Sequence, residues 1–271
     1  LVVAGVITAK SMARSYQVQS VLVDAARYKD AITQFKDRYN ALPGDMPNAT
    51  KYWGTHSVAC PLLPGYGTAS TAGTCNGNGD GKVRWYSYDG FVSAGGDPTG
   101  LALADSASEA SMVFRHLELA GLLKGEYYVS EDLGPMFRSD GFFYYYIPKF
   151  SKQQAAVWFV GANLAYADLY YAGGGIYSGT AVGNALQTAR FNAAAQGAQP
   201  RVGLETPTIT HAIDVKMDDG KPKGGKFEAS NGYGYGTTSY LLECVVSDGA
   251  GGYNYNLTYT GDSCRYLLSL D

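Results

Sequence analysis

The sequence predicts an α+β protein in which a long N-terminal α-helix packs on an antiparallel β-sheet head with inserted short helices and glycine-rich loops. Three observations predict this fold. Residues 1–42 place apolar side chains at helical spacing and contain no proline. Several later segments have the aromatic and β-branched composition of strands. Short helix signals and glycine-rich stretches separate these strands, in a chain with 35 glycines among 271 residues. We therefore expect a helix at 1–42 and a globular head at 43–271.

The N-terminal helix has two parts with different apolar patterns. Residues 1–9 are apolar nearly all round, so a single face of the head cannot cover them, and only lipid or a bundle of identical helices would. From residue 18 onward the apolar positions alternate steps of three and four, which is the period of one helix face. We expect this face to pack on the head, and its members are Val18, Val21, Ala25, Tyr28, Ile32, Phe35, Tyr39 and Leu42.

Pro43 and Gly44 are expected to end this helix. Its length would be roughly 60 Å, which is more than a head of this size needs for its core. The following segment, 46–54, is expected to be a loop that returns Tyr52 and Trp53 to the end of the helix. Residues 55–100 are rich in glycine and small polar residues, and they predict little regular structure beyond a strand at 83–86.

A second helix is expected to begin at the capping box formed by Ser106 and Glu109. Its apolar stripe consists of Met112, Val113, Leu117, Ala120 and Leu123. The segments 142–147 and 155–160 then predict two strands joined by a turn at 151–154.

The C-terminal third is expected to hold two short helices and four strands. Residues 181–195 predict the first of these helices. Thr206 as N-cap and Pro207 at the first position predict the other, which ends at 218–220. The strands are expected at 225–229, 240–246, 253–259 and 264–270.

The four cysteines fall into two pairs that are close in sequence. We expect Cys60 to bond Cys75 and Cys244 to bond Cys264, since each bridge would close a glycine-rich loop and stabilise it by about 3 kcal/mol. No C-x-x-C spacing indicates zinc or thioredoxin-like chemistry. Disulfides predict an oxidising compartment outside the cytoplasm. The alternative is four reduced, buried thiols.

Two acidic segments stand out, and the first is a candidate for metal binding. Asn76, Asn78 and Asp80 place side-chain oxygens at alternate positions of a glycine-rich loop, like the first half of a calcium loop. The loop differs from an EF-hand because Asn replaces the first acid and Ser87 stands where the bidentate glutamate belongs. The alternative is a glycine turn with positive φ beside Cys75. Calcium is the single cofactor that the sequence suggests.

The other acidic segment holds Asp218 and Asp219. The simpler interpretation is the C-terminus of a helix running into a turn. Because acids are unfavourable at that end of the helix dipole, we expect a partner among Lys216, Lys221 and Lys223.

Composition and motifs argue against two functional classes. A net charge of −3 and a pI near 5.6 leave no basic footprint for nucleic acid. Catalytic signatures such as G-x-S-x-G, H-E-x-x-H or a P-loop do not occur. His56, His116 and His211 stand in unrelated contexts, and we expect His116 to be a surface or interface residue of the second helix. We therefore predict no catalytic residues and no enzyme.

Five separated segments carry a resemblance to a known family. They are LVVAGVITAKSM at the start, YNALPGDMPNATKYW at 39–53, CNGNGDGK at 75–82, FRHLELAGLLKG at 114–125 and IDVKMDDGKPKGGKF at 213–227. Together with the C-terminal cysteine pair, they resemble the large type IV pilins with an N-terminal cleavage and methylation segment. The stretches 87–104 and 148–205 carry no motif of that family.

The resemblance implies a structural protein that works by polymerising. Residues 1–16 would be a membrane anchor before assembly and the packed core of a helical filament afterwards, while 18–42 hold the head. The residues expected to assemble are Leu1, Val2, Val3, Val6, Ile7, Met12 and Tyr16. The implied partners are identical subunits and, before assembly, the inner membrane. The implied location is an extracellular pilus or fimbrium.

The methylated aromatic residue and the glutamate that open the family's mature chains do not appear in the sequence. We therefore expect the chain to begin partway into the family's helix. Three other functions remain open: a minor pilin or tip adhesin, a secretion-system pseudopilin, and a secreted enzyme with an anchor helix. The abundance of the protein in sheared filaments separates a major subunit from a tip protein.

Overall fold

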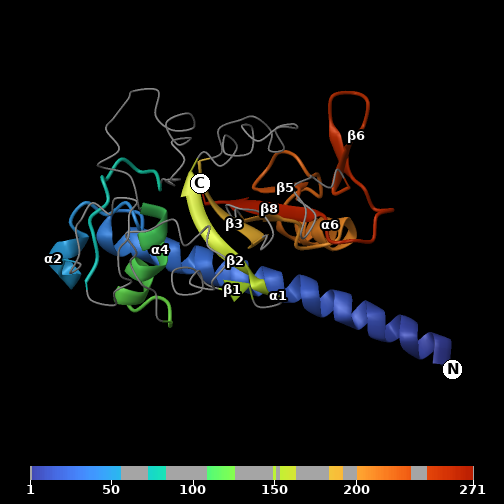
Figure 1. Cartoon of the computed structure of the whole chain (residues 1–271), viewed down its shortest axis with the longest axis horizontal. Coiled ribbons are helices and arrows are strands. Elements are labelled where there is room, and N and C mark those ends of the chain that lie inside the picture. Colours follow the sequence, from blue (N-terminus) through green and yellow to red (C-terminus); the bar gives the residue numbers. More distant parts are fainter. Residues whose placement is uncertain are drawn as a thin grey trace.

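The structure is a computed structural model that describes residues 2–55, 73–83, 109–125, 149–150, 153–162, 183–191, 200–232 and 243–270. These residues form a mixed fold in which helices accompany an antiparallel sheet (Figure 1), in agreement with the predicted α+β class. The helices are α1 (Val2–Tyr39), α2 (Ala49–Trp53), α4 (Glu109–Leu119) and α6 (Pro207–Met217). The strands are β1 (Lys149–Phe150), β2 (Gln153–Ala162), β3 (Asn184–Phe191), β4 (Pro200–Val202), β5 (Phe227–Asn231), β6 (Val245–Ser247), β7 (Tyr253–Tyr255) and β8 (Cys264–Ser269).

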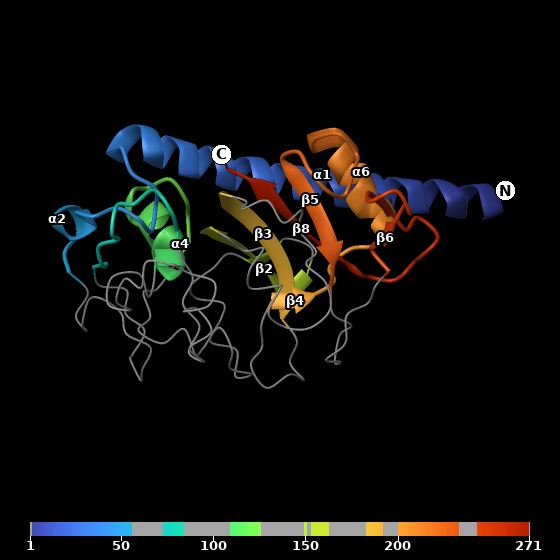
Figure 2. The ribbon, with the colours of Figure 1, turned by 90° about the horizontal axis from the view of Figure 1, so that it is seen from above.

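Helix α1 runs along the head, with α6 and α4 beside it (Figure 2). Its inward face is buried over four turns and more, from Val18 to Phe35, and Tyr39 and Leu42 are partly buried at its end. The helix ends at Tyr39, three residues earlier than predicted. The reason is Asn40, which takes a left-handed conformation with a φ of 50° and donates its N–H to the Lys36 carbonyl at 2.9 Å.

The main sheet has the strand order β1-β2-β3-β8-β5, with β4 also paired to β3, and every pair is antiparallel. One row of side chains across β5 and β8 belongs to the same core cluster as the buried face of α1. In that row Phe227 lies opposite Leu268 and Ala229 opposite Tyr266. The rings of Phe227 and Tyr266 stack with their centroids 5.2 Å apart. This row joins the helix to the sheet.

The prediction of a helix at 181–195 is wrong. Residues 184–191 form strand β3, which lies between β2 and β8 in the sheet. Four consecutive side chains of β3, from Ala185 to Thr188, are buried, so both faces of the strand are covered. The alanine-rich sequence has a helical preference in isolation, but ladder hydrogen bonds to two neighbouring strands override such a weak preference.

Several other predicted elements differ in their bounds. Strand β2 includes the predicted 155–160 and pairs with β1. Residues 153–154 of the predicted turn belong to β2, while residues 151–152 and the predicted strand 142–147 lie outside the described residues. Of the predicted strand 83–86, only Val83 is described, and it is not in a strand. The loop at 46–54 contains the short helix α2. Helix α6 begins at Pro207, with the Thr206 hydroxyl accepting the Ile209 N–H at 3.4 Å, as a threonine N-cap should.

Candidate functional site

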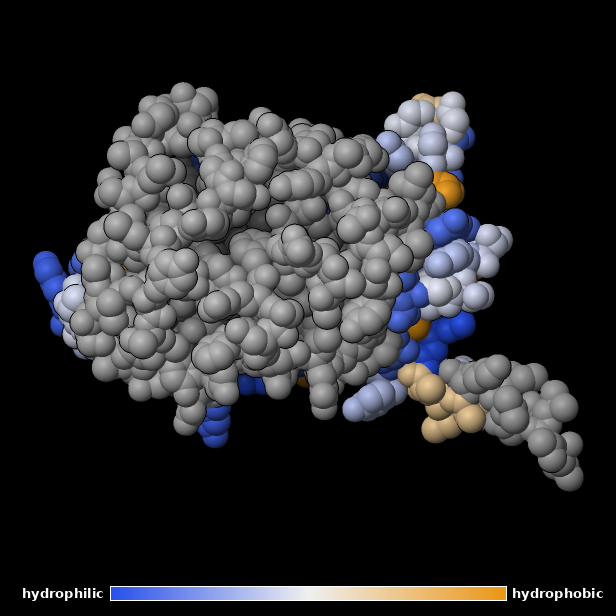
Figure 3. Space-filling view, in the orientation of Figure 1, coloured by the Kyte–Doolittle hydropathy of each residue, from blue (hydrophilic) through white to orange (hydrophobic). Residues whose placement is uncertain are grey.

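The N-terminal part of α1 extends beyond the rest of the described structure (Figure 1). Two large side chains on this part, Met12 and Tyr16, are 68% and 78% exposed. Figure 3 shows apolar residues on the surface of the helix where it leaves the head. The backbone of Val2, Val3, Val6 and Ile7 is helical, while Leu1 and the side chains of residues 1–8 lie outside the described part.

The exposed apolar residues of α1 share one face of the helix. Steps of four and seven residues separate Met12, Tyr16 and Val23, and both steps return to the same helix face. Val23 is 56% exposed. This outer face lies opposite the buried face that starts at Val18 and Val21. We call Met12, Tyr16 and Val23 the outer stripe. Further along the same face the side chains become polar and stay exposed, at Asp30, Gln34 and Asp37.

The helix is fastened to the head at the point where it begins to project. Gln17 donates a side-chain hydrogen bond to the fully buried Glu205. The backbone of Glu205 in turn pairs with Cys264: the Cys264 N–H donates to the Glu205 carbonyl at 2.9 Å, and the Glu205 N–H donates back at 3.2 Å. This connection holds the start of the projecting part against the first residue of β8.

Cys264 is also one end of a disulfide. It bonds Cys244, twenty residues earlier, as the sequence predicts, and both cysteines are fully buried. The side-chain oxygen of Asn231 accepts the N–H groups of Cys244 at 2.8 Å and Val245 at 3.0 Å, which fixes the start of the bridged loop. Cys75 is buried and disulfide-bonded as well, and its predicted partner Cys60 lies outside the described residues.

The C-terminal end of α1 is held by a cluster of aromatic rings from α1, α2 and α4. Phe35 is fully buried at its centre and lies 4.6 Å from Tyr39, 6.0 Å from His116 and 6.1 Å from Trp53, measured between ring centroids. Tyr52 covers the cluster and is 58% exposed. The expected return of Tyr52 and Trp53 to the helix end is present in the structure.

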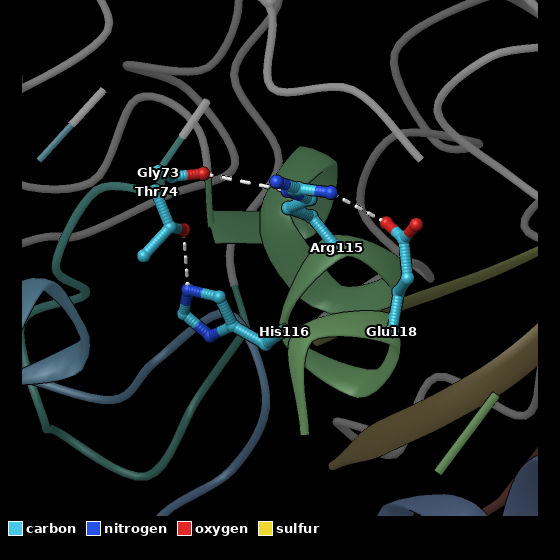
Figure 4. Close-up of polar contacts among 5 residues, drawn as sticks. All are labelled: Gly73, Thr74, Arg115, His116 and Glu118. Atoms are coloured by element: carbon cyan, nitrogen blue, oxygen red, sulfur yellow. Dashed lines mark hydrogen bonds and ion pairs between the residues drawn. The ribbon is translucent and has the colours of Figure 1, made fainter. Parts of the chain in front are cut away.

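The prediction that His116 lies at the surface is wrong, because its side chain is completely buried. Its Nδ1 accepts the Gly44 N–H at 2.9 Å, and its Nε2 lies 2.9 Å from the Thr74 hydroxyl (Figure 4). Since Nδ1 is an acceptor, the neutral ring carries its proton on Nε2. Burial, opposed in part by the Cys75 carbonyl, lowers the pKa of His116 from 6.5 to about 4. His116 therefore joins α4 to the chain after α1 and to the segment that carries Cys75.

Arg115, the neighbour of His116, also contacts the segment that carries Thr74 and Cys75, at Gly73. It donates to the Gly73 carbonyl at 3.4 Å and forms an ion pair with Glu118 at 2.7 Å (Figure 4). The sequence does contain a signal for the burial of His116. His116 stands four residues after Met112 and three after Val113, so helical spacing places it on the apolar stripe of α4.

The loop predicted to bind calcium surrounds a carboxylate in the structure. The N–H groups of Gly79 and Asp80 donate to Asp45 Oδ1 at 2.7 and 3.1 Å, and the N–H of Gly81 donates to Asp45 Oδ2 at 2.8 Å. Gly79 and Gly81 have φ values of 78° and 83°, which glycine adopts without strain. Asp45 is almost fully buried, and burial raises its pKa despite these three hydrogen bonds.

The three predicted calcium ligands have backbone partners in this loop. The side-chain oxygens of Asn76, Asn78 and Asp80 accept the N–H groups of Thr50, Asp80 and Lys82, each at 2.9 Å. These are the bonds of the alternative that the sequence left open, a glycine turn. Calcium binding at this loop remains a prediction. Asp45 itself was not singled out by sequence reasoning, although it directly follows the helix-ending Pro43 and Gly44.

A second acidic cluster lies at the end of α6. One ligand oxygen from each of Asp214, Asp218 and Asp219 lies within 4.8 Å of the others. Asp214 is fully buried and accepts a hydrogen bond from the Tyr255 hydroxyl group at 2.7 Å. Burial raises the pKa of Asp214 to about 6. Asp218 accepts the N–H groups of residues 226 and 227, and Asp219 accepts the Lys221 N–H at 2.8 Å. The expected partner Lys221 therefore acts through its backbone, and the bonds fold the chain into a turn.

Within the described residues, no helix combines the length and the apolar character needed to cross a membrane. Comparisons with protein-family models, with curated proteins and with solved structures found no match for this chain.

Proposed function

We propose that this protein is the structural subunit of an extracellular filament of the type IV pilin kind, with the pilin arrangement of a projecting helix on a globular head. In this proposal identical subunits assemble through α1. The observation that carries it is the outer stripe: Met12, Tyr16 and Val23 are exposed on a helix whose opposite face is buried in the head.

Burial of the stripe by neighbouring subunits would supply part of the assembly energy. A fully exposed methionine or valine side chain gains about 1.5–3 kcal/mol when it is buried against other apolar groups. The projecting helix of one subunit and the head-bound part of another are different surfaces, so the contact is heterologous. A heterologous contact that does not close into a ring extends into a helical filament.

The polar end of the same helix face limits how far the contact extends. Asp30, Gln34 and Asp37 continue the line of the outer stripe and are exposed. Buried charges are unfavourable unless they are paired, so we place this end in solvent within the filament. The Cys244–Cys264 disulfide supports an oxidising, extracellular setting.

Charged substitutions on the projecting helix are expected to abolish filaments and to leave the head folded. Val6→Asp, Val3→Asp and Tyr16→Asp each place a carboxylate in the proposed helix bundle, where an unpaired charge costs several kcal/mol. Electron microscopy of material sheared from cells producing each variant measures filament formation. Circular dichroism and the melting temperature of the purified subunit report the state of the head.

Gln34→Asp is the matched control, since it adds the same charge to the polar end of the same face. We expect it to leave filaments intact. Normal filaments from Val6→Asp and Tyr16→Asp would refute the proposal. If Gln34→Asp loses filaments as the other variants do, the boundary that we place between the apolar and polar parts of this helix face is refuted.

A further inference from the structure

The loop around Asp45 contains two asparagine–glycine pairs, Asn76-Gly77 and Asn78-Gly79. In such a pair the backbone nitrogen of the glycine can attack the side-chain amide carbon of the asparagine. The product is a five-membered succinimide ring and ammonia, and water then opens the ring to aspartate or isoaspartate. Glycine favours the reaction because no side chain hinders the attack. Both asparagines are exposed, so water reaches them.

At Asn78 the structure places groups that assist both halves of this reaction. The attacking nitrogen belongs to Gly79, and its N–H is shared between the Asp45 carboxylate at 2.7 Å and the Asp45 backbone carbonyl at 3.0 Å. A carboxylate in this position can take the proton that the nitrogen must lose. The side-chain oxygen of Asn78 accepts the Asp80 N–H at 2.9 Å. That N–H stabilises the negative charge that develops on the oxygen during the attack.

At Asn76 the first of these groups is missing. The nitrogen of Gly77 donates to the Met46 carbonyl at 2.9 Å, and a backbone carbonyl does not accept a proton at neutral pH. The side-chain oxygen of Asn76 accepts the Thr50 N–H at 2.9 Å, so its carbonyl is polarised as that of Asn78 is. The two pairs therefore differ chiefly in the acceptor that faces the attacking nitrogen.

We propose that Asn78 is a self-modification site at which Asp45 promotes cyclisation and deamidation. Asp45 takes the proton from the Gly79 nitrogen as that nitrogen bonds to the Asn78 side-chain carbon. The same proton then passes to the departing amide nitrogen, the carbon–nitrogen bond of the side chain breaks, and ammonia leaves. Water adds to the succinimide and gives aspartate or isoaspartate, and Asp45 returns to its starting form.

The modification changes the contacts of the loop. Glu109 on α4 accepts the backbone N–H of Asn78 at its Oε1 at 3.0 Å, and Asp80 lies two residues further along the loop, so deamidation at position 78 adds a negative charge near two acidic residues. Like charges near one another repel, and isoaspartate also lengthens the backbone by one atom. Both effects weaken the connection between the loop and α4. The result is a slow, one-way change of the head surface, and it does not depend on filament assembly.

The test compares Asn78 with Asn76 in the same molecules. Purified protein is kept at neutral pH, folded in one sample and unfolded in denaturant in the other. Peptide mapping by mass spectrometry, with fragmentation that distinguishes the two positions, measures both deamidation rates over time. We expect Asn78 to react at least about tenfold faster than Asn76 in the folded protein, since a positioned proton acceptor contributes roughly that much or more. In the unfolded protein the two rates should be similar.

Asp45→Asn tests the acceptor directly, because the amide oxygen can still accept the Gly79 N–H but is a far weaker base. The variant should lose the preference for Asn78, with its fold checked by circular dichroism. Equal rates at Asn76 and Asn78 in the folded wild type would overturn the proposal. A preference that persists in folded Asp45→Asn would overturn the role of Asp45. If that variant does not fold, the wild type alone provides the test. The ratio of the deamidation rate at Asn78 to that at Asn76 should then fall to about one when the wild type is unfolded, and an unchanged ratio would overturn the proposal.

Discussion

Replacing Phe35 by alanine is expected to lower the free energy of unfolding by about 3–5 kcal/mol. Phe35 is fully buried, and its ring touches those of Tyr39, Trp53 and His116. The substitution leaves a cavity at the junction of α1, α2 and α4. The surrounding rings belong to three different elements, so they can close the cavity only by moving whole segments. Denaturant unfolding of the purified protein measures the loss.

Val23→Ala is the matched control for Phe35→Ala, because it removes apolar atoms from the exposed face of the same helix. It should change the free energy of unfolding by less than about 0.5 kcal/mol. Similar losses in the two variants would contradict the assignment of Phe35 to the core and of Val23 to the outer stripe. The pair also separates stability from assembly, since Val23→Ala should weaken filaments without weakening the head.

The second large effect is a pH dependence in which two buried groups oppose each other. His116 has a pKa lowered to about 4, against 6.5 in an unfolded chain. Between these values the unfolded chain binds a proton that the folded chain does not. The stability supplied by a neutral His116 is therefore complete above pH 6.5 and falls as the pH drops from 6.5 to about 4. The full loss is about 3 kcal/mol, at 1.36 kcal/mol per pKa unit.

Asp214 acts in the other direction over the same range. Burial raises its pKa from 3.8 to about 6, so between these values the folded chain binds the proton that the unfolded chain lacks. Acidification through this window therefore adds stability. Burial raises the pKa of Asp45 as well, which acts in the same sense. The wild-type protein should show a shallow pH dependence between pH 6.5 and 4, because these contributions offset that of His116.

Single variants are expected to reveal the two contributions. His116→Asn keeps a side-chain oxygen that can accept the Gly44 N–H, but this side chain does not titrate. The free energy of unfolding of this variant, relative to that of wild type, should therefore rise by about 3 kcal/mol between pH 7 and pH 4. Asp214→Asn should show the opposite trend and lose stability steeply on acidification. Urea unfolding at a series of pH values measures both. Stability differences that stay constant with pH would contradict the assignment of these groups.

The sequence predicted the elements whose signals are local. The apolar period from Val18 to Leu42 and the Thr206-Pro207 start of α6 are encoded within a few turns of chain, and the structure has helices at both. Strand β3 was predicted as a helix because its pairing with β2 and β8 comes from segments distant in sequence. No local pattern in 184–191 records that pairing.

The polar connections of the head were the hardest to predict, for the same reason. Asp45 and its three N–H donors are separated by more than thirty residues, and His116 and Thr74 by forty-two. Each residue alone resembles an ordinary loop or surface residue. The Cys244–Cys264 pair could be predicted from sequence, because the small number of cysteines limits the possible partners.

The central claim is that identical subunits cover the outer stripe in a filament. Oxidative footprinting tests it most directly, since methionine and tyrosine are readily oxidised and the native sequence places both on the stripe. Intact sheared filaments and dissociated subunits are exposed to the same dose of hydroxyl radical, and modification of Met12 and Tyr16 is measured by mass spectrometry. Tyr52, which is exposed at the other end of the helix, serves as the internal control. We expect Met12 and Tyr16 to be modified in subunits and protected in filaments, with Tyr52 modified in both. Equal modification of Met12 and Tyr16 in filaments and subunits would contradict the account.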